Sequence, residues 1–192
     1  MNWYKIAAAA VILLLVGAAF FMRLYTTTVH SEKGQHLSHI LPDGSEIHLN
    51  ADSYLSYHPY WWNFNREIEF EGEAFFSVEN LASRQTGGKQ FSVVSENGTT
   101  DVLGTSFNIN SRSDKYRVFC KTGKVKVSAT QMDIEFIINP GEIALIDYQS
   151  KTGRVDQVKS NKITGWMQNK FDFTSVPLVE VLKELERQYN IT

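Results

Sequence analysis

The run REIEFEGEAFFSV at residues 66–78 constrains the fold of this chain more than any other stretch. Ile68 and Phe70 alternate with glutamates up to Gly72, and this period of two is typical of a strand with one buried face. A glycine inside such a pattern marks a bulge or sharp bend, because glycine adopts strained dihedral angles at low cost. The run therefore predicts two short strands joined at Gly72, forming a bent ribbon at the centre of a β domain.

Short alternating runs continue on both sides of this ribbon. Turn-forming residues separate them roughly every 8–12 residues, which is typical of antiparallel β folds. The pattern predicts a mainly β fold of many short antiparallel strands, and it leaves a sandwich, a roll or barrel, and a β-solenoid open. Strands are expected at 54–57, 89–95, 100–103, 106–110, 116–120, 124–129, 134–138, 142–147 and 155–158. The residues expected to shape turns and bends are Gly44, Gly72, Gly104, Pro140 and Gly141.

Residues 6–22 form a run of 17 residues without a charged or strongly polar side chain. As a helix this run would be about 25 Å long, slightly less than the roughly 30 Å hydrocarbon core of a bilayer. Three interpretations are open: a membrane anchor with aromatic residues at both ends, a cleaved signal peptide, or a buried core helix. The first two place the residues after 25 outside the cytoplasm. We expect an anchor with its flanks at 1–25 and a polar linker at 26–33.

A dense aromatic group stands in HPYWWNFN at residues 58–65. Packing under a loop accounts for such a group, since large aromatic side chains dominate cores. Aromatic residues also dominate contacts with sugars and protein partners. A carbohydrate-binding β module is therefore the alternative function, and its platform would consist of Trp61, Trp62 and Phe64.

Glutamates at a spacing of two are the second conspicuous group. A glycosidase needs one carboxylate on each side of a cleft. Carboxylates on one strand face are instead expected to be solvated. We therefore interpret as a solvated face the residues Glu67, Glu69, Glu71 and Glu73.

The motifs and the composition point away from catalysis. The formal net charge is −2 and no Lys/Arg cluster occurs, so nucleic-acid binding is not expected. Cys120 is the only cysteine and lies in an apolar strand, which indicates a buried structural thiol. His36 and His39 would point to opposite faces of a strand and make a poor metal pair. With no HExxH, CxxC or GxSxG motif, we expect no catalytic residue, cofactor or metal site and no enzyme.

The C-terminal residues are expected to form a strand at 166–173 and then a helix. Ser175 suits the N-cap and Pro177 the first turn of this helix. Its apolar residues form one continuous stripe, which we expect to lie in a core. The helix either begins a second, truncated α+β subdomain at 161–192 or packs on the β domain. The stripe consists of Leu178, Val181, Leu182, Leu185 and Tyr189.

Five segments, in this order, resemble the FecR family of anti-sigma regulators: LPDGSEIHLNADSYLSY, REIEFEGEAFFSV, FSVVSENGTTDVLGTSFNI, KTGKVKV and PGE. The end, WMQNKFDFTSVPLVEVLKELERQYN, is similar to the start of the small α+β domain of this family. That domain resembles the short N-terminal module of secretins and TonB-dependent transporters. The resemblance covers roughly residues 34–192, with the β domain at 34–160.

The resemblance implies a single-pass protein of the inner (cytoplasmic) membrane with its β domain in the periplasm. Such a protein relays the state of a TonB-dependent outer-membrane transporter, through that transporter's signalling domain, to an extracytoplasmic-function sigma factor. The family places its sigma-binding helices ahead of the apolar run, which only five residues precede here, so sigma binding is expected only in a longer chain. The implied partner-binding region contains Phe171, Phe173, Leu178, Val181, Leu182, Leu185 and Tyr189.

Overall fold

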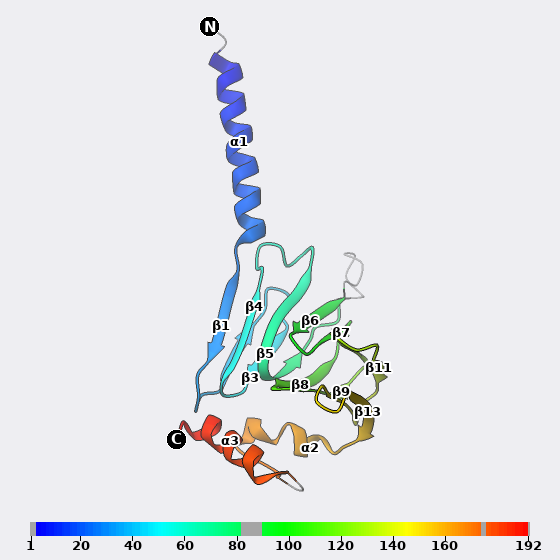
Figure 1. Cartoon of the computed structure of the whole chain (residues 1–192). Helices are drawn as coiled ribbons and strands as arrows, with labels where there is room; N and C mark the ends of the chain where they lie inside the picture. Colours follow the sequence, from blue (N-terminus) through cyan, green and yellow to red (C-terminus); the bar gives the residue numbers. More distant parts are fainter. Residues whose placement is uncertain (1–2, 82–89, 174–175, 192) are drawn as a thin grey trace.

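The computed structural model describes residues 3–81, 90–173 and 176–191, and it places a long helix and a C-terminal segment at opposite ends of a β domain (Figure 1). The long helix is α1 (Trp3–Leu24). The C-terminal segment, residues 160–173 and 176–191, lies against the far end of the β domain. It contains α2 (Ser160–Ile163), the 3₁₀ helix η1 (Gly165–Gln168) and α3 (Leu178–Tyr189).

The strands form one sheet that folds over into two halves, joined by β5 (Arg66–Ser77). All neighbouring strands are antiparallel except β5 and β6. The prediction of a mainly β fold is confirmed. In spatial order on either side of β5, the first half-sheet contains β1 (Thr27–Ser31), β4 (Ser53–Tyr57), β6 (Phe91–Ser95), β7 (Gly98–Val102), β10 (Val125–Ala129) and β11 (Glu135–Ile138). The second contains β2 (Leu37–Ile40), β3 (Glu46–Leu49), β8 (Ser106–Arg112), β9 (Lys115–Thr122), β12 (Glu142–Asp147) and β13 (Thr152–Gln157).

The change from one half-sheet to the other occurs within β5, at Gly72. Glu71 pairs with Tyr54 in the first half-sheet, and Gly72 pairs with Ser111 in the second. Gly72 has φ +105°, and a Cβ placed there would lie 2.5 Å from Oγ of Ser53. One continuous bent strand therefore replaces the two short strands expected, and glycine is required by both the dihedral angle and the close approach of β4.

The apolar core lies between the two half-sheets and takes side chains from both. Leu55, Ile68 and Val93 from the first half-sheet belong to the same buried cluster as Phe107 and Val118 from the second. Two stacked rings lie within it, Phe76 and Phe107, with centroids 5.0 Å apart.

The other residues singled out for turns lie in connections between strands. Gly44, with φ +91°, ends the turn between β2 and β3. Pro140 and Gly141 lie between β11 and β12, and Gly141 has φ +88°. Gly104 approaches Asn80 closely, because a Cβ there would lie 2.4 Å from the Cβ of Asn80.

Two expectations from the sequence are wrong. Residues 27–31, placed in a linker, form β1 and pair with β4 along its whole length. Their polar composition hides the strand, since Val29, which packs against the core, is its only apolar residue. The final strand expected at 166–173 is absent from the described residues. A 3₁₀ turn lies there instead, ended by Asn169 at φ 55°, a left-handed conformation that Asn tolerates. The predicted strand start at 89 and the predicted cap Ser175 lie outside the described residues.

Candidate partner-binding site

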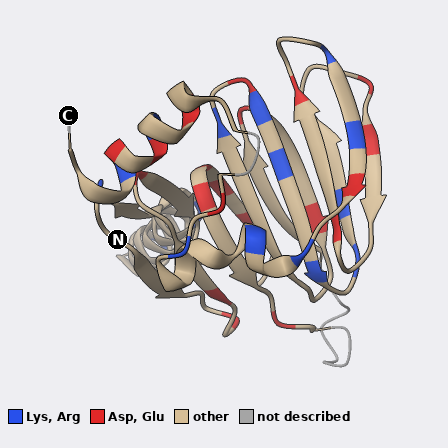
Figure 2. Cartoon of the chain, turned by 90° about the horizontal axis from the view of Figure 1, so that it is seen from below, with Lys and Arg blue, Asp and Glu red and all other residues tan. Residues whose placement is uncertain are grey.

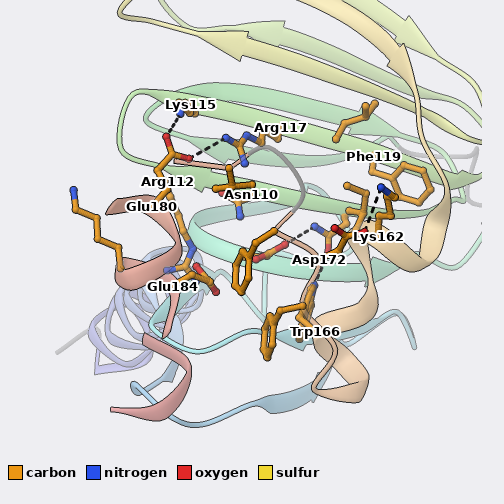
Figure 3. A pocket seen from close by; sticks show the side chains of 18 of the residues that line it. Asn110, Arg112, Lys115, Arg117, Phe119, Lys162, Trp166, Asp172, Glu180 and Glu184 are labelled. Carbon is orange, nitrogen blue, oxygen red and sulfur yellow. Dashed lines mark hydrogen bonds and ion pairs between the residues drawn. The ribbon is translucent and has the colours of Figure 1, made fainter. Parts of the chain in front are cut away.

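A groove of about 510 Å³ runs between the outer face of the second half-sheet and the C-terminal segment (Figure 3). β8 supplies one wall because its side chains alternate between the two faces of the sheet. Phe107 and Ile109 point into the core, whereas Asn108, Asn110 and Arg112 line the groove. Lys115, Arg117 and Phe119 of β9 continue this wall in the same alternation.

Ion pairs connect the C-terminal segment to this wall (Figure 3). Lys115 Nζ lies 2.5 Å from one carboxylate oxygen of Glu180 in α3, and Arg117 lies 3.7 Å from the other. The hydrogen bond from Lys115 lowers the pKa of Glu180 below its usual value. Within the segment itself, Lys162 pairs with Asp172 at 3.2 Å. All these groups are partly exposed, so water screens the pairs and each contributes little to stability.

A buried carboxylate, Glu73 of β5, lies at the inner end of the groove. Its two oxygens accept hydrogen bonds from the side-chain amides of Asn50, at 3.0 Å, and Asn108, at 2.9 Å. Burial raises the pKa of Glu73 above its usual value, and the positive charge of Arg112 opposes that rise. Burying a carboxylate costs free energy because the group loses its water. Its hydrogen bonds to the two amides offset part of that cost and fix the positions of the three side chains.

The expectation of four solvated glutamates is therefore wrong for one of them. Glu67, Glu69 and Glu71 are exposed on the first half-sheet. Glu73 follows the bend at Gly72 and so lies on the outer face of the second half-sheet, beneath the C-terminal segment.

Helix α3 contacts the β domain through its polar face. The Gln188 side-chain amide donates to Oδ1 of Asn50 at 2.7 Å, and its oxygen lies 2.9 Å from Nε2 of His36. The backbone N–H of Gly34 donates to the carbonyl of Arg187 at 2.7 Å. Asn50 therefore connects α3 to Glu73, since its amide donates to that carboxylate.

A second connection comes from Trp166 of η1. Its indole N–H donates to Oδ1 of Asn108 at 3.2 Å, and its ring meets the ring of His36 edge-on at 5.4 Å. Trp166 is buried. The C-terminal segment is thus held by one continuous polar network that joins Trp166, Asn108, Glu73, Asn50 and Gln188.

The apolar stripe of α3 is left largely uncovered, because the opposite face makes these contacts. Leu178 is 71% exposed, Leu182 50% and Tyr189 59%. Val181 and Leu185 are half-buried. The expectation that this stripe lies in a core is therefore wrong for the described residues. Contiguous exposed apolar side chains on a soluble domain are typical of sites for protein partners.

The predicted partner-binding residues thus fall into two adjoining sets. Phe171 and Phe173 line the groove, with their rings stacked at 6.1 Å and nearly parallel. The five residues of α3 form the exposed or half-exposed stripe beside it. Sequence reasoning missed the polar residues that hold the segment in place, although the polar–apolar alternation of residues 106–112 was a usable signal. Those residues are Asn50, Glu73, Asn108, Trp166 and Gln188.

The sequence profile of the FecR protein family matches residues 27–126. Two crystal structures of a candidate anti-sigma factor from Parabacteroides distasonis ATCC 8503, at 2.50 and 1.65 Å resolution, share the fold with TM-scores of 0.77 and 0.76. Both are 31% identical to this chain, and the alignments cover 86% and 85% of it and 76% and 75% of theirs. No curated protein matches. The chain belongs to the FecR family. Membership and these relatives support a regulatory, anti-sigma signalling role.

In this FecR protein the aromatic group of residues 58–65 does not form one platform. Trp62 is 2% exposed and packs edge-on against Tyr57 and Phe91 in the core. Trp61 and Phe64 stack on each other at 4.5 Å on the surface. A sugar platform made of all three residues is therefore excluded, and with it the observation on which the carbohydrate-binding alternative depended.

The cysteine and the histidine considered earlier for reactivity and metal binding, Cys120 and His39, have structural surroundings in this FecR protein. Burial raises the pKa of the Cys120 thiol to about 11, so the reactive thiolate is scarce at neutral pH. His39 lies 2.9 Å from the hydroxyl of Tyr57. Across residues 3–81, 90–173 and 176–191, no group of three or more His, Cys, Asp or Glu side chains is placed to hold a metal ion.

Proposed function

We propose that this FecR-family chain acts in an envelope signalling pathway that ends at an extracytoplasmic-function sigma factor, and that it receives the state of a TonB-dependent outer-membrane transporter by protein–protein contact. In this proposal α1 spans the inner membrane once, and the residues after 25 lie in the periplasm. The 22 residues of α1 form a helix about 33 Å long, enough for a roughly 30 Å hydrocarbon core. No side chain of α1 is buried inside the protein, as expected for a helix that lipid surrounds.

The observation that carries this proposal is the placement of α1 and α3 at opposite ends of the β domain (Figure 1). With α1 in the inner membrane, α3 and its exposed apolar stripe lie at the end of the β domain that is far from that membrane. A signalling domain extending from an outer-membrane transporter would approach from that side. We assign residues 161–192 to the start of the small α+β module that receives this partner.

The charges around the stripe indicate which kind of contact to expect. Seen from below, the segment carries both acidic and basic residues (Figure 2). Helix α3 itself carries three glutamates and two basic residues. We therefore expect a partner held by apolar anchors with a polar rim, and no recognition by overall charge.

The test is a binding measurement with purified signalling domains of TonB-dependent transporters from the same genome. The full chain is immobilised in nanodiscs, and the double variant Leu178→Ser, Leu182→Ser is compared with wild type. Loss of two apolar anchors is expected to weaken binding at least tenfold, since each central anchor contributes about 1–2 kcal/mol or more.

Ile137→Ser is the matched control. Ile137 is 65% exposed, similar to the two leucines, but it lies on β11 at the edge of the first half-sheet. It should leave binding unchanged. Binding by no signalling domain, or equal losses in the control and the double variant, would contradict the proposal.

A further inference from the structure

The loop between β4 and β5, residues 58–65, lies at the same end of the β domain as α1 (Figure 1). It exposes aromatic side chains there: Tyr60 is 52% exposed and Phe64 63%. Trp61 is half-buried and stacks on Phe64. Neither the groove nor the α3 stripe uses these residues, and Trp62 is the only aromatic residue of the loop that enters the core.

This aromatic loop contacts the end of α1 directly. The guanidinium of Arg23 lies 5.5 Å from the ring centroid of Trp61. The rings of Tyr25 and Tyr60 lie 5.4 Å apart. The side chain of His58 also contacts this connection, since its Nδ1 lies 3.1 Å from the backbone carbonyl of Tyr25.

The connection between α1 and the β domain is short. α1 ends at Leu24 and β1 begins at Thr27, where it pairs with Tyr57 at the end of β4. Only two residues separate the helix from the sheet. The height of the aromatic loop relative to the end of α1 is therefore fixed by strand pairing and by the ring contacts together.

The composition of the loop fits one environment in particular. Trp and Tyr are enriched where a bilayer meets water, because their rings are apolar at one end and polar at the other. HPYWWNFN contains no Lys, Arg, Asp or Glu, so no charge opposes its entry into that layer. At the other end of α1, Trp3 and Tyr4 are also exposed, as a second interfacial belt would be.

We infer that the aromatic loop is a membrane-docking surface, in which Tyr60, Trp61 and Phe64 enter the interfacial layer of the bilayer that α1 spans. The occupant is the lipid interface itself, recognised by its apolar and dipolar character and independent of anionic headgroups. This inference rests on the proposed membrane span of α1. Docking would fix the tilt of the β domain and so keep the C-terminal segment pointing away from the membrane.

Spin labels on the full chain measure how deeply each labelled position lies in the bilayer. The chain is placed in vesicles of phosphatidylcholine with and without phosphatidylglycerol. Replacing the buried Cys120 by Ser removes the only native cysteine, so one label is placed at a time: Phe64→Cys in the loop, Leu178→Cys at the far end, and Leu14→Cys inside α1. The readout is the ratio of collision rates with oxygen, which concentrates in lipid, and with a water-soluble nickel chelate. We expect this ratio to be several-fold higher at position 64 than at position 178 in both lipids. Adding Tyr60→Ser and Trp61→Ser should lower it towards the value at position 178.

The label at position 14 separates this inference from the proposed span. If position 14 is in lipid but position 64 is as water-exposed as position 178, the span stands and the docking is wrong. If position 14 is in water, the span is wrong and the docking fails with it. An unchanged ratio after Tyr60→Ser and Trp61→Ser would also overturn the docking, because the aromatic side chains would then not drive it.

Discussion

The two faces of β8 are covered in different ways. On the inner face, Phe107 and Ile109 are fully buried in an apolar core shared by both half-sheets. On the outer face, Asn108 accepts a hydrogen bond from Trp166 of the C-terminal segment, and Arg112 lines the adjoining groove of about 510 Å³. Apolar burial resists opening in proportion to the area removed from water, whereas a hydrogen bond contributes a smaller net free energy, because opening replaces it by hydrogen bonds to water. We therefore expect the C-terminal segment to open more readily than the β domain.

The largest expected effect tests the β domain. Phe107→Ala should lower the free energy of unfolding by about 3–5 kcal/mol, because it removes a buried ring and leaves a cavity beside Phe76. Chemical denaturation monitored by circular dichroism measures this loss. A loss below about 1 kcal/mol would place the main stabilising contacts elsewhere.

Next comes the bend that produces the two half-sheets. Gly72→Ala should cost about 2–4 kcal/mol, from the positive φ and from the clash of the new Cβ with Ser53. Gly44→Ala is the matched control, since it has φ +91° but only an ordinary contact at 3.8 Å. Its expected cost is about 1–2 kcal/mol. Equal costs for the two variants would show that close packing at the corner contributes nothing.

On the outer face, Asn108→Ala should loosen the segment without unfolding the domain. It leaves the indole N–H of Trp166 and one oxygen of Glu73 without these partners, at a cost of about 1–3 kcal/mol. Tryptic cleavage at Lys170 and Lys183 should accelerate by roughly tenfold for each 1.4 kcal/mol. Asn110→Ala, on the same face, should change neither cleavage nor stability. Accelerated cleavage with a matching global loss of stability would erase the distinction between the two faces.

The smallest effect concerns pH. Burial raises the pKa of Glu73 above its usual 4.5, against the opposing charge of Arg112 and with a small addition from Glu184. A carboxyl whose pKa is raised in the folded state contributes stability that is fully present below pH 4.5 and is lost as pH rises through the folded-state pKa. The stability of Glu73→Gln relative to wild type should therefore increase from pH 4.5 towards 7. Thermal melts of both proteins across this range check the sign. A relative stability of the variant that decreases with pH would show that Arg112 outweighs burial.

The β domain could be predicted from sequence because strand alternation and turn-forming residues can be recognised within short segments. The alternation in residues 66–78 and its interruption at Gly72 record both the strand and its bend. The way the C-terminal segment packs could not be predicted from sequence, because an amphipathic helix such as α3 normally buries its apolar face. Here Gln188 and the other polar residues make the contacts instead. Which face of α3 contacts the β domain depends on partner residues from β3–β5 and β8, which are far apart in sequence. The burial of Glu73 depends on such distant residues too.

Hydrogen exchange of the full chain tests the central claim most directly: the C-terminal segment opens separately from the β domain and receives the partner. Alone, the amides of α3 should exchange through a local opening, at least a hundredfold faster than those of β8, which corresponds to a difference of about 2.8 kcal/mol. Adding a transporter signalling domain should slow exchange in α3 and leave β8 unchanged. Exchange of α3 as slow as that of β8, with the partner protecting only other surfaces, would contradict it.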